Sequence, residues 1–330
     1  MGQKNIKIEQ GGFVVVVVLC MVIMMSVMLL GFNYESRTNL CRVDDFRKSQ
    51  DALNCAKSGL NIAIAAVKDN PDINNDKSIL KLFSGEETFA IDQGKCSIII
   101  SEESGKLNIK HLKDENGNLD RARIEHLLRL IDLLNQQGIS RSNINYGFVP
   151  SIIDWTDSDD EIECLPFIKN DNLGAESSYY NQLKPSYMCR NKPLETIEEL
   201  LLVRGITPQI FERIRNYLTV YGDNGKININ CAAKLVLESL SENMDSTLAQ
   251  LIIDRRKFKP FKSIVELRDM PGMTDSLYQA INKVTTVEPM DQYYQVTSRG
   301  EVESLIRTVN AILRRNTETK NIDVILYKEL

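Results

Sequence analysis

An uncharged apolar run from Phe13 to Phe32 dominates the pattern of hydrophobic and polar residues along the chain. In a helix that rises about 1.5 Å per residue, roughly twenty residues span about 30 Å, which is the thickness of the hydrocarbon core of a bilayer. We therefore expect residues 13–32 to cross a membrane once. Lys4 and Lys7 precede the run and favour a cytoplasmic N-terminus, although two arginines soon after the run oppose this orientation.

The head of the chain is short and basic and ends in Gly12, directly before Phe13. This arrangement resembles the type IV prepilin signal, in which a membrane peptidase cuts between Gly and Phe and the apolar helix stays on the mature protein. The resemblance implies a leader of residues 1–12, cleavage between Gly12 and Phe13, and methylation of the new N-terminus. A plain single-span anchor that is never cut is the alternative that hydropathy alone suggests.

The fifth residue after the expected cut is Val17. Ordinary pilins carry Glu there, and its carboxylate is thought to meet the N-terminal ammonium of the subunit ahead in the fibre. An ionised carboxylate in a membrane is costly without such a partner. Val17 therefore indicates either a chain that is no pilin or a subunit at a fibre tip, with no subunit ahead of it.

Helical spacing of apolar residues continues up to Asn70-Pro71, so we expect the membrane helix to extend into one long amphipathic helix. Three apolar or alternating runs follow, separated by turn residues, and each predicts a short strand. They lie at residues 88–91, 96–100 and 106–109.

A second group of elements lies near the C-terminus, with strands expected at residues 294–298 and 323–327 and a helix from about Val302 to Arg315. Almost everything between the two groups has helical spacing. The simplest arrangement is an α+β fold in which a pilin-like N-terminal helix and a small antiparallel sheet are interrupted by a large all-α domain. The expected division is 1–12 (leader), 13–32 (transmembrane part of the helix), 33–109 (first part of the αβ domain), 110–286 (inserted domain) and 287–330 (second part of the αβ domain).

Two segments of the predicted insertion, Leu194–Tyr221 and Phe261–Thr286, look like helix-hairpin-helix or SAM-like units, whose glycine turn can hold a phosphate. A basic cluster would assist, formed by Arg255, Arg256, Lys257, Lys259 and Lys262. However, acids outnumber bases in the first hairpin, they balance in the second, the net charge of the chain is −5, and phosphate binders need a surplus of positive charge. We favour structural hairpins without a nucleic-acid partner, and keep a membrane-anchored DNA receptor as the alternative function.

An acidic loop, residues 154–163, followed by Glu176, is the other candidate site. Its carboxylates repel one another unless water or a cation separates them, and oxygen ligands at alternating positions suit Ca²⁺. A solvated acidic loop without an ion is the simpler interpretation, and a hydrolytic pair of carboxylates a third. No Ser/His/Asp, Cys/His or phosphate-loop pattern accompanies the loop. We therefore expect no enzymatic activity.

Six of the seven cysteines follow the membrane run and would lie in an oxidising space if the chain is exported. The sequence leaves their pairing open. Cys164 with Cys189 is the preferred disulfide, because the two residues flank one polar loop. His111 and His126 have no cysteine partners at zinc-ligand spacing, so we interpret both as structural.

Several motifs together resemble the type II secretion system protein K family, the largest minor pseudopilin of that machine. In chain order they are Gly12-Phe13 with Val17, the phrase 104–109, the stretch 153–159, Gly174-Ala175-Glu176 with Tyr179-Tyr180, residues 194–200 and residues 225–230.

The resemblance implies a pseudopilin fold with a helical insertion, and a place at the pseudopilus tip in complex with minor pseudopilins I and J. It also implies initiation of pseudopilus assembly for export of folded proteins across the outer membrane, processing by the prepilin peptidase, and an inner-membrane anchor with the C-terminal domain in the periplasm. Calcium is expected in the insertion. The ligands would come from Asp157, Asp159, Asp160, Glu161 and Glu176.

Overall fold

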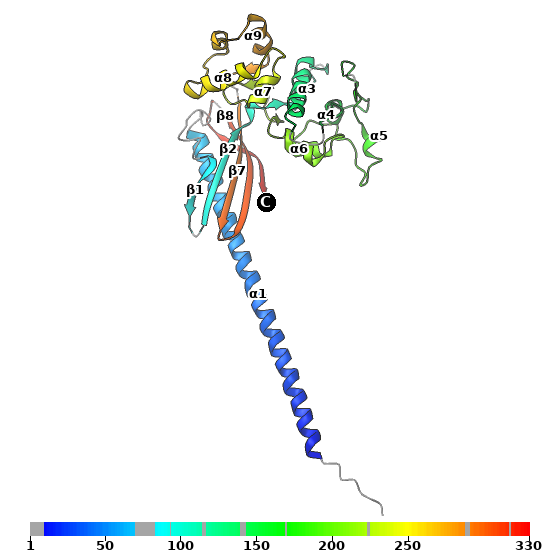
Figure 1. Cartoon of the computed structure of the whole chain (residues 1–330), viewed down its shortest axis with the longest axis vertical. Helices are drawn as coiled ribbons and strands as arrows, with labels where there is room; N and C mark the ends of the chain where they lie inside the picture. Colours follow the sequence, from blue (N-terminus) through cyan, green and yellow to red (C-terminus); the bar gives the residue numbers. More distant parts are fainter. Residues whose placement is uncertain are drawn as a thin grey trace, which may run out of the picture.

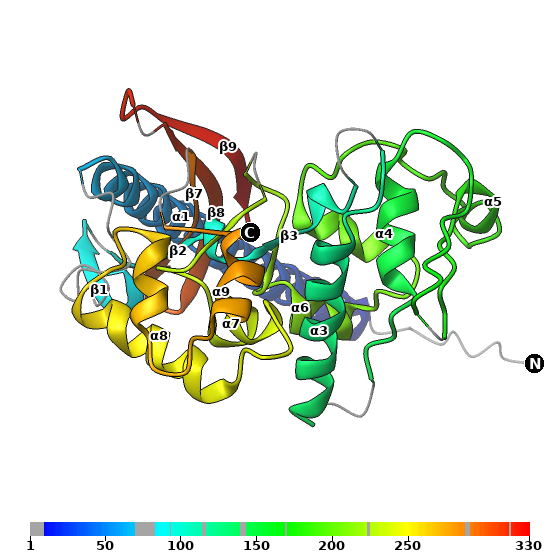
Figure 2. The same cartoon turned by 90° about the horizontal axis from the view of Figure 1, so that it is seen from above.

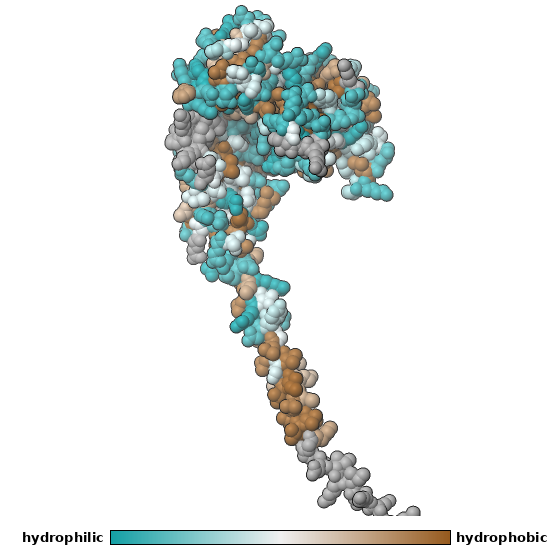
Figure 3. Space-filling view, viewed as in Figure 1, coloured by the Kyte–Doolittle hydropathy of each residue, from teal (hydrophilic) through white to brown (hydrophobic). Residues whose placement is uncertain are grey.

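The computed structural model describes residues 10–69, 83–92, 94–113, 117–138, 143–168, 170–222, 225–287, 291–316 and 318–330. Its longest element is helix α1, Gln10–Asp69, of 60 residues, whose first half projects away from the rest of the molecule (Figure 1). The most apolar part of α1 has a mean hydropathy of 3.2 over 18 residues, and none of it is buried (Figure 3). By length and composition, α1 is therefore compatible with a single-pass membrane anchor.

The second half of α1 packs on a five-stranded antiparallel sheet, in the order β1-β2-β7-β8-β9 (Figures 1 and 2). The strands are β1 (Ser84–Ile91), β2 (Gly94–Glu102), β7 (Asp291–Val302), β8 (Leu305–Asn316) and β9 (Ile322–Glu329). Apolar residues of α1 such as Ala56, Leu60 and Ala63 form one core with Ile98, Val296 and Val309 of the sheet. Burial of apolar side chains on one stripe of the helix therefore fixes it to the sheet.

Small residues let α1 approach the sheet closely. A Cβ atom added to Gly300 of β7 would lie 2.0 Å from the backbone oxygen of Ala52 in α1. A Cβ atom added to Gly59 of α1 would lie 2.2 Å from Ser298 Oγ. Both distances are far below van der Waals contact, so glycine at these two positions sets the distance between helix and sheet.

The expected helix from Val302 to Arg315 is wrong, because this segment forms strand β8. Val309, Ala311 and Leu313 alternate toward the core under α1, and a tight turn at Glu303, with φ of +53°, returns the chain from β7. The apolar residues of this segment fit the spacing of a helix and also the in–out alternation of a strand. Pairing with β7 along the whole segment selects the strand.

The strand expected at residues 106–109 also differs from the prediction. Only Leu107–Asn108 form a strand, β3, and it pairs in parallel with β4 (Leu218–Thr219) outside the five-stranded sheet. A similar parallel pair joins β5 (Ile227–Asn228) to β6 (Thr285–Thr286). In each first strand the Asn side chain accepts a hydrogen bond from the backbone N–H two residues later, so the two pieces share one local structure.

A large insertion lies between β2 and β7 and has its own hydrophobic core. Figures 1 and 2 show it at the end of the sheet away from the projecting half of α1. Its helices are η1 (Glu103–Gly105), η2 (Ile109–His111), α3 (Arg121–Gln136), α4 (Phe148–Thr156), α5 (Ser177–Tyr180), η3 (Ile197–Leu202), α6 (Pro208–Ile214), α7 (Lys234–Ser239), α8 (Ser246–Phe258), η4 (Ile264–Asp269) and α9 (Asp275–Asn282). The insertion is therefore mainly helical, and the finer division at residues 110 and 286 stays a prediction.

Both expected hairpins are present as a 3₁₀ helix, a glycine turn and an α-helix. Gly205 joins η3 to α6 with φ of +86°, and Gly272 joins η4 to α9 with φ of +90°. Only glycine adopts such angles without strain, so these two residues fix the hairpin turns.

Candidate metal centre

The acidic loop begins where α4 ends. Helix α4 is almost entirely buried, and the ring of Trp155 meets that of Tyr180 edge-on at 5.0 Å between centroids. This packing fixes Asp154, whose Oδ1 accepts a 2.9 Å hydrogen bond from the backbone N–H of Glu163. The segment leading to Glu176 lies beside it, since the N–H of Gly174 donates to the Glu163 carbonyl at 2.9 Å. The helix end and the later strand-like segment therefore hold carboxylates against one another.

Three of these carboxylates converge. One oxygen each from Asp157, Asp159 and Glu176 lie within 4.8 Å of one another. Glu176 is 2% exposed, Asp157 is half-buried and Asp159 is exposed. The group therefore has a buried floor and an open rim.

Within the part of the chain that the structure describes, three oxygens of the group have no hydrogen-bond partner. They are Asp157 Oδ1 and both carboxylate oxygens of Glu176. A buried carboxylate without a donor is costly, whereas a bound cation would satisfy all three atoms at once. The donor set, carboxylate oxygens from the loop after α4 and from the segment before α5, fits Ca²⁺.

Burial raises the pKa of Glu176 to about 7, and the charge of Asp157 adds to this effect. Burial also raises the pKa of Asp154 to about 7 and raises that of Asp157. Desolvation and mutual repulsion thus disfavour the ionised form of these carboxyl groups. A divalent cation would favour the ionised form, because it would supply the missing positive charge.

A lysine supplies part of that charge from within the chain. Lys113 Nζ lies 2.7 Å from Asp157 Oδ2 and 3.1 Å from Glu163 Oε2. The contact of Lys113 with Asp157 lowers the pKa of that carboxyl group and opposes the effect of its burial. The Lys113 contact occupies one oxygen of Asp157 and leaves the other for a ligand.

Two of the predicted ligands lie outside the converging group. The Oδ1 atom of Asp160 accepts from Asn191 Nδ2 at 3.4 Å, and its charge contributes to the raised pKa of Glu176. Glu161 is exposed, and its backbone N–H donates to Asp159 Oδ1 at 2.9 Å. The ligand set as a whole stays a prediction, with Asp157, Asp159 and Glu176 brought together.

Sequence reasoning missed Asn191. Its Nδ2 donates to the Asp159 carbonyl at 2.9 Å, and its buried Oδ1 has no partner among the described residues. An amide oxygen is an ordinary Ca²⁺ ligand. Asn191 lies far along the chain from the acidic loop, and no spacing rule links them, so only the fold reveals it.

Cys164 and Cys189 are both free thiols in the structure. Cys189 is buried, its Sγ donates to the Asp154 carbonyl at 3.4 Å, and burial raises its pKa to about 12. Cys164 is exposed and accepts a hydrogen bond from Asn172 Nδ2 at 3.6 Å. Their pairing stays a prediction.

The expected cleavage site lies in the first turns of α1. The Gly12–Phe13 bond is part of the helix, and Phe13 is 73% exposed. Residues 1–9 of the predicted leader, including Lys4 and Lys7, lie outside the described residues. Cleavage there stays a prediction.

The basic cluster of the hairpins is used largely within the insertion. Arg255 Nη2 lies 2.8 Å from Glu266 Oε2, and Lys257 Nζ lies 3.3 Å from Asp254 Oδ1. Arg256 Nη1 donates to the backbone oxygen of Ile229 at 2.5 Å. Three of the five cationic side chains are thus committed to internal partners, which disfavours the cluster as a phosphate-binding face.

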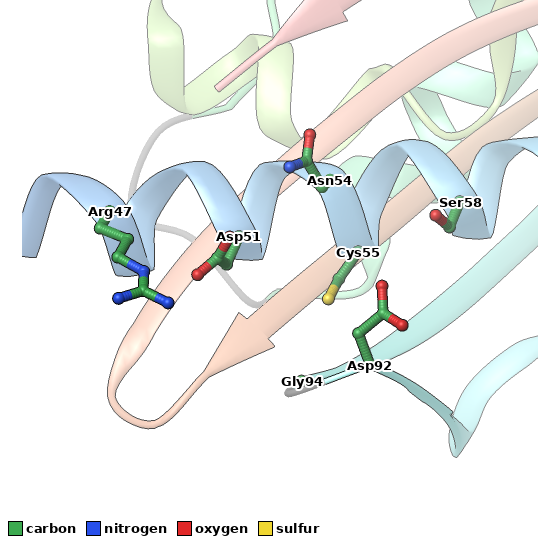
Figure 4. Close-up of a pocket in the computed structure, with 7 residues that line it drawn as sticks. All are labelled: Arg47, Asp51, Asn54, Cys55, Ser58, Asp92 and Gly94. Atoms are coloured by element: carbon green, nitrogen blue, oxygen red, sulfur yellow. The ribbon is translucent and has the colours of Figure 1, made fainter.

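Another hollow, of about 180 Å³, lies where α1 meets the β1–β2 turn (Figure 4). Cys55 of α1 and Asp92 of the turn point toward one another across it, near Asp51. Burial, followed by the charges of Asp92 and Asp51, raises the pKa of the Cys55 thiol. A thiol that stays protonated is a poor nucleophile, so this hollow lacks the chemistry of a cysteine active site.

Comparison with known proteins gives a consistent result. Two family models, both described as type II secretion system (T2SS) protein K, match residues 105–223 and 227–288, together more than half of the chain. The type II secretion system protein K of Aeromonas hydrophila is 20% identical over 331 residues, which cover 94% of this chain and 95% of that protein. That of Klebsiella pneumoniae is 20% identical over 190 residues, 56% of each chain.

A solved structure shares the fold. It is described as the crystal structure of the GspK-GspI-GspJ complex from the enterotoxigenic Escherichia coli type 2 secretion system, and it matches with a TM-score of 0.66. The sequences are 18% identical, and the match covers 88% of this chain and 99% of that one. Because the two family models together match more than half of the chain, the chain belongs to the type II secretion system protein K family, whose members are minor pseudopilins of that machine.

Proposed function

We propose that this minor pseudopilin lies at the tip of the type II secretion pseudopilus, where it forms a complex with minor pseudopilins I and J. One observation carries the proposal: the insertion lies at the end of the sheet away from the projecting half of α1 (Figure 1). At that end the insertion is wider than the sheet, so it would obstruct another subunit stacked on top of it. The insertion therefore suits a position at the tip of the fibre, where no further subunit is stacked.

Val17 supports the same position. A carboxylate at the fifth mature residue would serve a subunit ahead in the fibre, and this chain has an apolar residue there. At the tip no such ion pair is needed, and an unpaired carboxylate in the membrane would be costly. From this position the protein initiates pseudopilus assembly, which drives export of folded proteins across the outer membrane.

The partners follow from the related structure, whose description places a K subunit in one complex with I and J. The apolar part of α1 anchors the chain in the bacterial inner membrane, with the sheet and insertion in the periplasm. The prepilin peptidase removes residues 1–12 on the cytoplasmic side. The role is structural, without catalysis.

Calcium stabilises the insertion in this proposal. The cation would be held by Asp157, Asp159 and Glu176, with Asp160 and Glu161 at the rim and Asn191 as a further oxygen donor. The raised pKa values of Glu176 and Asp154 indicate that these carboxyl groups lack a nearby positive charge. The cation would supply that charge. Its effect is to hold the loop after α4 against the segment before α5.

The proposal is tested by the N-terminal sequence and mass of the protein in membranes, with and without the prepilin peptidase, and by purification with I and J. We expect a mature chain that begins at Phe13 only when the peptidase is present, and a complex with one copy of each subunit. An uncut N-terminus in both strains would contradict the peptidase assignment. Failure to bind I and J would contradict the tip assignment.

A further inference from the structure

Strand β9 forms one edge of the five-stranded sheet and is unusually apolar for an exposed strand. Val324 and Ile325 are each 47% exposed, Tyr327 is 44% exposed and Leu330 is 52% exposed. Helix α1 packs mainly on β2, β7 and β8, so it leaves most of β9 uncovered. A long apolar edge strand is a template for another strand.

The backbone of β9 has an open side. Leu330 and Thr308 of β8 exchange both backbone hydrogen bonds, at 2.9 and 3.1 Å. Because antiparallel pairs alternate, Lys328 and Leu326 also bond to β8. The N–H and C=O groups of Tyr327 and Glu329 therefore point to the open edge, where an added strand would bind them.

The opposite edge of the sheet is protected. Strand β1 has an irregularity in its pairing with β2 between Ser84 and Thr88. Irregular pairing discourages the addition of a strand. In β9, two of the three charged side chains have partners within the chain, Asp323 with Arg314 at 2.9 Å and Glu329 with Lys57 at 2.9 Å, and the third, Lys328, is exposed.

A cavity of about 440 Å³ lies at the part of β9 nearest the insertion. Its walls come from both parts of the protein, including Tyr221, Tyr293, Ile325 and Leu326. Two charged residues of the wall have partners, Arg314 with Asp323 and Glu195 with Arg190 at 2.5 Å. Lys110 is exposed, and in the described ranges no carboxylate pairs with it. Among the described residues that line the cavity, Lys110 is therefore a positive charge without an ion-pair partner.

We propose that β9 is a docking edge for an extended segment of a smaller pilin-like subunit, which adds as a sixth strand beside Tyr327 and Glu329 and places a carboxylate near Lys110. The inference rests on the proposed function, since it assigns the surface for I or J. A subunit anchored in the same membrane presents its own domain at the height of this sheet, and the charge of Lys110 selects an acidic end for the strand.

The test uses the full-length chain in detergent with subunits I and J, and two substitutions of one residue. Tyr327→Pro removes an N–H that points to the open edge and breaks no bond to β8. Tyr327→Thr removes the same aromatic ring and keeps the N–H. We expect Tyr327→Pro to weaken binding of one partner at least tenfold, with Tyr327→Thr within threefold of the wild type. Hydrogen exchange of the amides of residues 327–330 should slow in the wild-type complex.

A second pair of variants tests the charge. Lys110→Glu should weaken the same partner, and Lys110→Arg should bind like the wild type. Equal binding of both would overturn the acidic end of the strand. Because hydrogen exchange is read on the unmodified chain, the inference stays testable even where a variant is poorly folded.

Each of the other possible results decides whether strand addition to β9 stands. If the wild type binds I and J but Tyr327→Pro binds equally and the β9 amides are unprotected, strand addition is overturned and the tip function stands. Equal losses for Tyr327→Pro and Tyr327→Thr would assign the contact to the side chain and also overturn it. Protection of β9 without partners, rising with protein concentration, would make a second copy the occupant. A wild type that binds neither subunit would overturn both proposals.

Discussion

The ammonium of Lys113 lies 2.7 Å from Asp157 Oδ2, while the other oxygen of that carboxylate, Oδ1, is buried without a partner in the described ranges. The chain thus carries one fixed cation beside the candidate metal centre and leaves room for another. The two cations would neutralise different oxygens of one side chain.

Lys113→Met should destabilise the calcium-free protein by about 1–3 kcal/mol, because Asp157 and Glu163 lose a partly buried partner. Added calcium should recover much of this loss, so the calcium-dependent rise in Tm should be larger in the variant than in the wild type. Melting curves with calcium and with a chelator measure both effects. Lys283→Met, at an exposed lysine, is the control, and an equal calcium effect in all three proteins would contradict the prediction.

Glu176 should make the calcium-free protein less stable as pH rises. Its folded-state pKa, about 7, is above the ordinary value of 4.5, so between these values the folded chain holds a proton that the unfolded chain has lost. The stability contribution is therefore complete below pH 4.5 and is lost by about pH 7. Glu176→Gln should remove the Glu176 share of this pH dependence, leaving that of Asp154, and should also reduce the stabilisation by calcium. The difference in Tm between variant and wild type, from pH 4.5 to 8, measures it.

His126 should make the stability of the protein change with pH in the opposite direction, at acid pH. The imidazole on α3 is 4% exposed, and burial, assisted by Arg129, lowers its pKa from 6.5 to about 4. Below pH 6.5 the unfolded chain binds a proton that the folded chain refuses, so stability falls as pH drops toward 4, by about 3 kcal/mol. Urea unfolding of His126→Leu should lack this fall. A parallel fall in variant and wild type would assign the acid sensitivity to other groups.

Gly300→Ala should separate α1 from the sheet. The new methyl group would lie 2.0 Å from the Ala52 oxygen and 2.6 Å from the Ala56 nitrogen, and backbone atoms of a helix cannot give way singly. Overpacking of this kind costs roughly 1–3 kcal/mol or more. Faster proteolysis of the αβ part and a lower Tm are expected. Gly31→Ala, where nothing lies within 4 Å, should change neither.

Much of this fold follows from local sequence patterns. The apolar run and helical spacing predict α1, and alternating runs predict β1, β2, β7 and β9. The helix predicted in place of β8 was wrong because residues such as Leu305, Ile306 and Val309 fit both the spacing of a helix and the alternation of a strand. Only the pairing with β7 selects the strand. Strand β3 was assigned to the wrong sheet because its partner, β4, lies more than a hundred residues further along the chain.

The candidate site divides in the same way. Asp157 and Asp159 stand in one acidic loop, and Glu176 follows a recognisable Gly-Ala pair, so the sequence predicts that they converge. Lys113 and Asn191 come from distant segments that look ordinary in isolation. Their roles depend on packing of α4 against its neighbours, which no local pattern encodes.

The position of the insertion between neighbouring strands also bears on how the chain folds. Glu102 at the end of β2 pairs with Tyr294 of β7, although about 190 residues separate them. Closing so long a flexible loop costs conformational entropy, but an insertion that folds first on its own core brings its two ends together and shortens the loop to a few residues. The folded insertion would then hold the end of β2 close to the start of β7. The strands that follow it in the chain, β7, β8 and β9, would add to a β2 that is already in position.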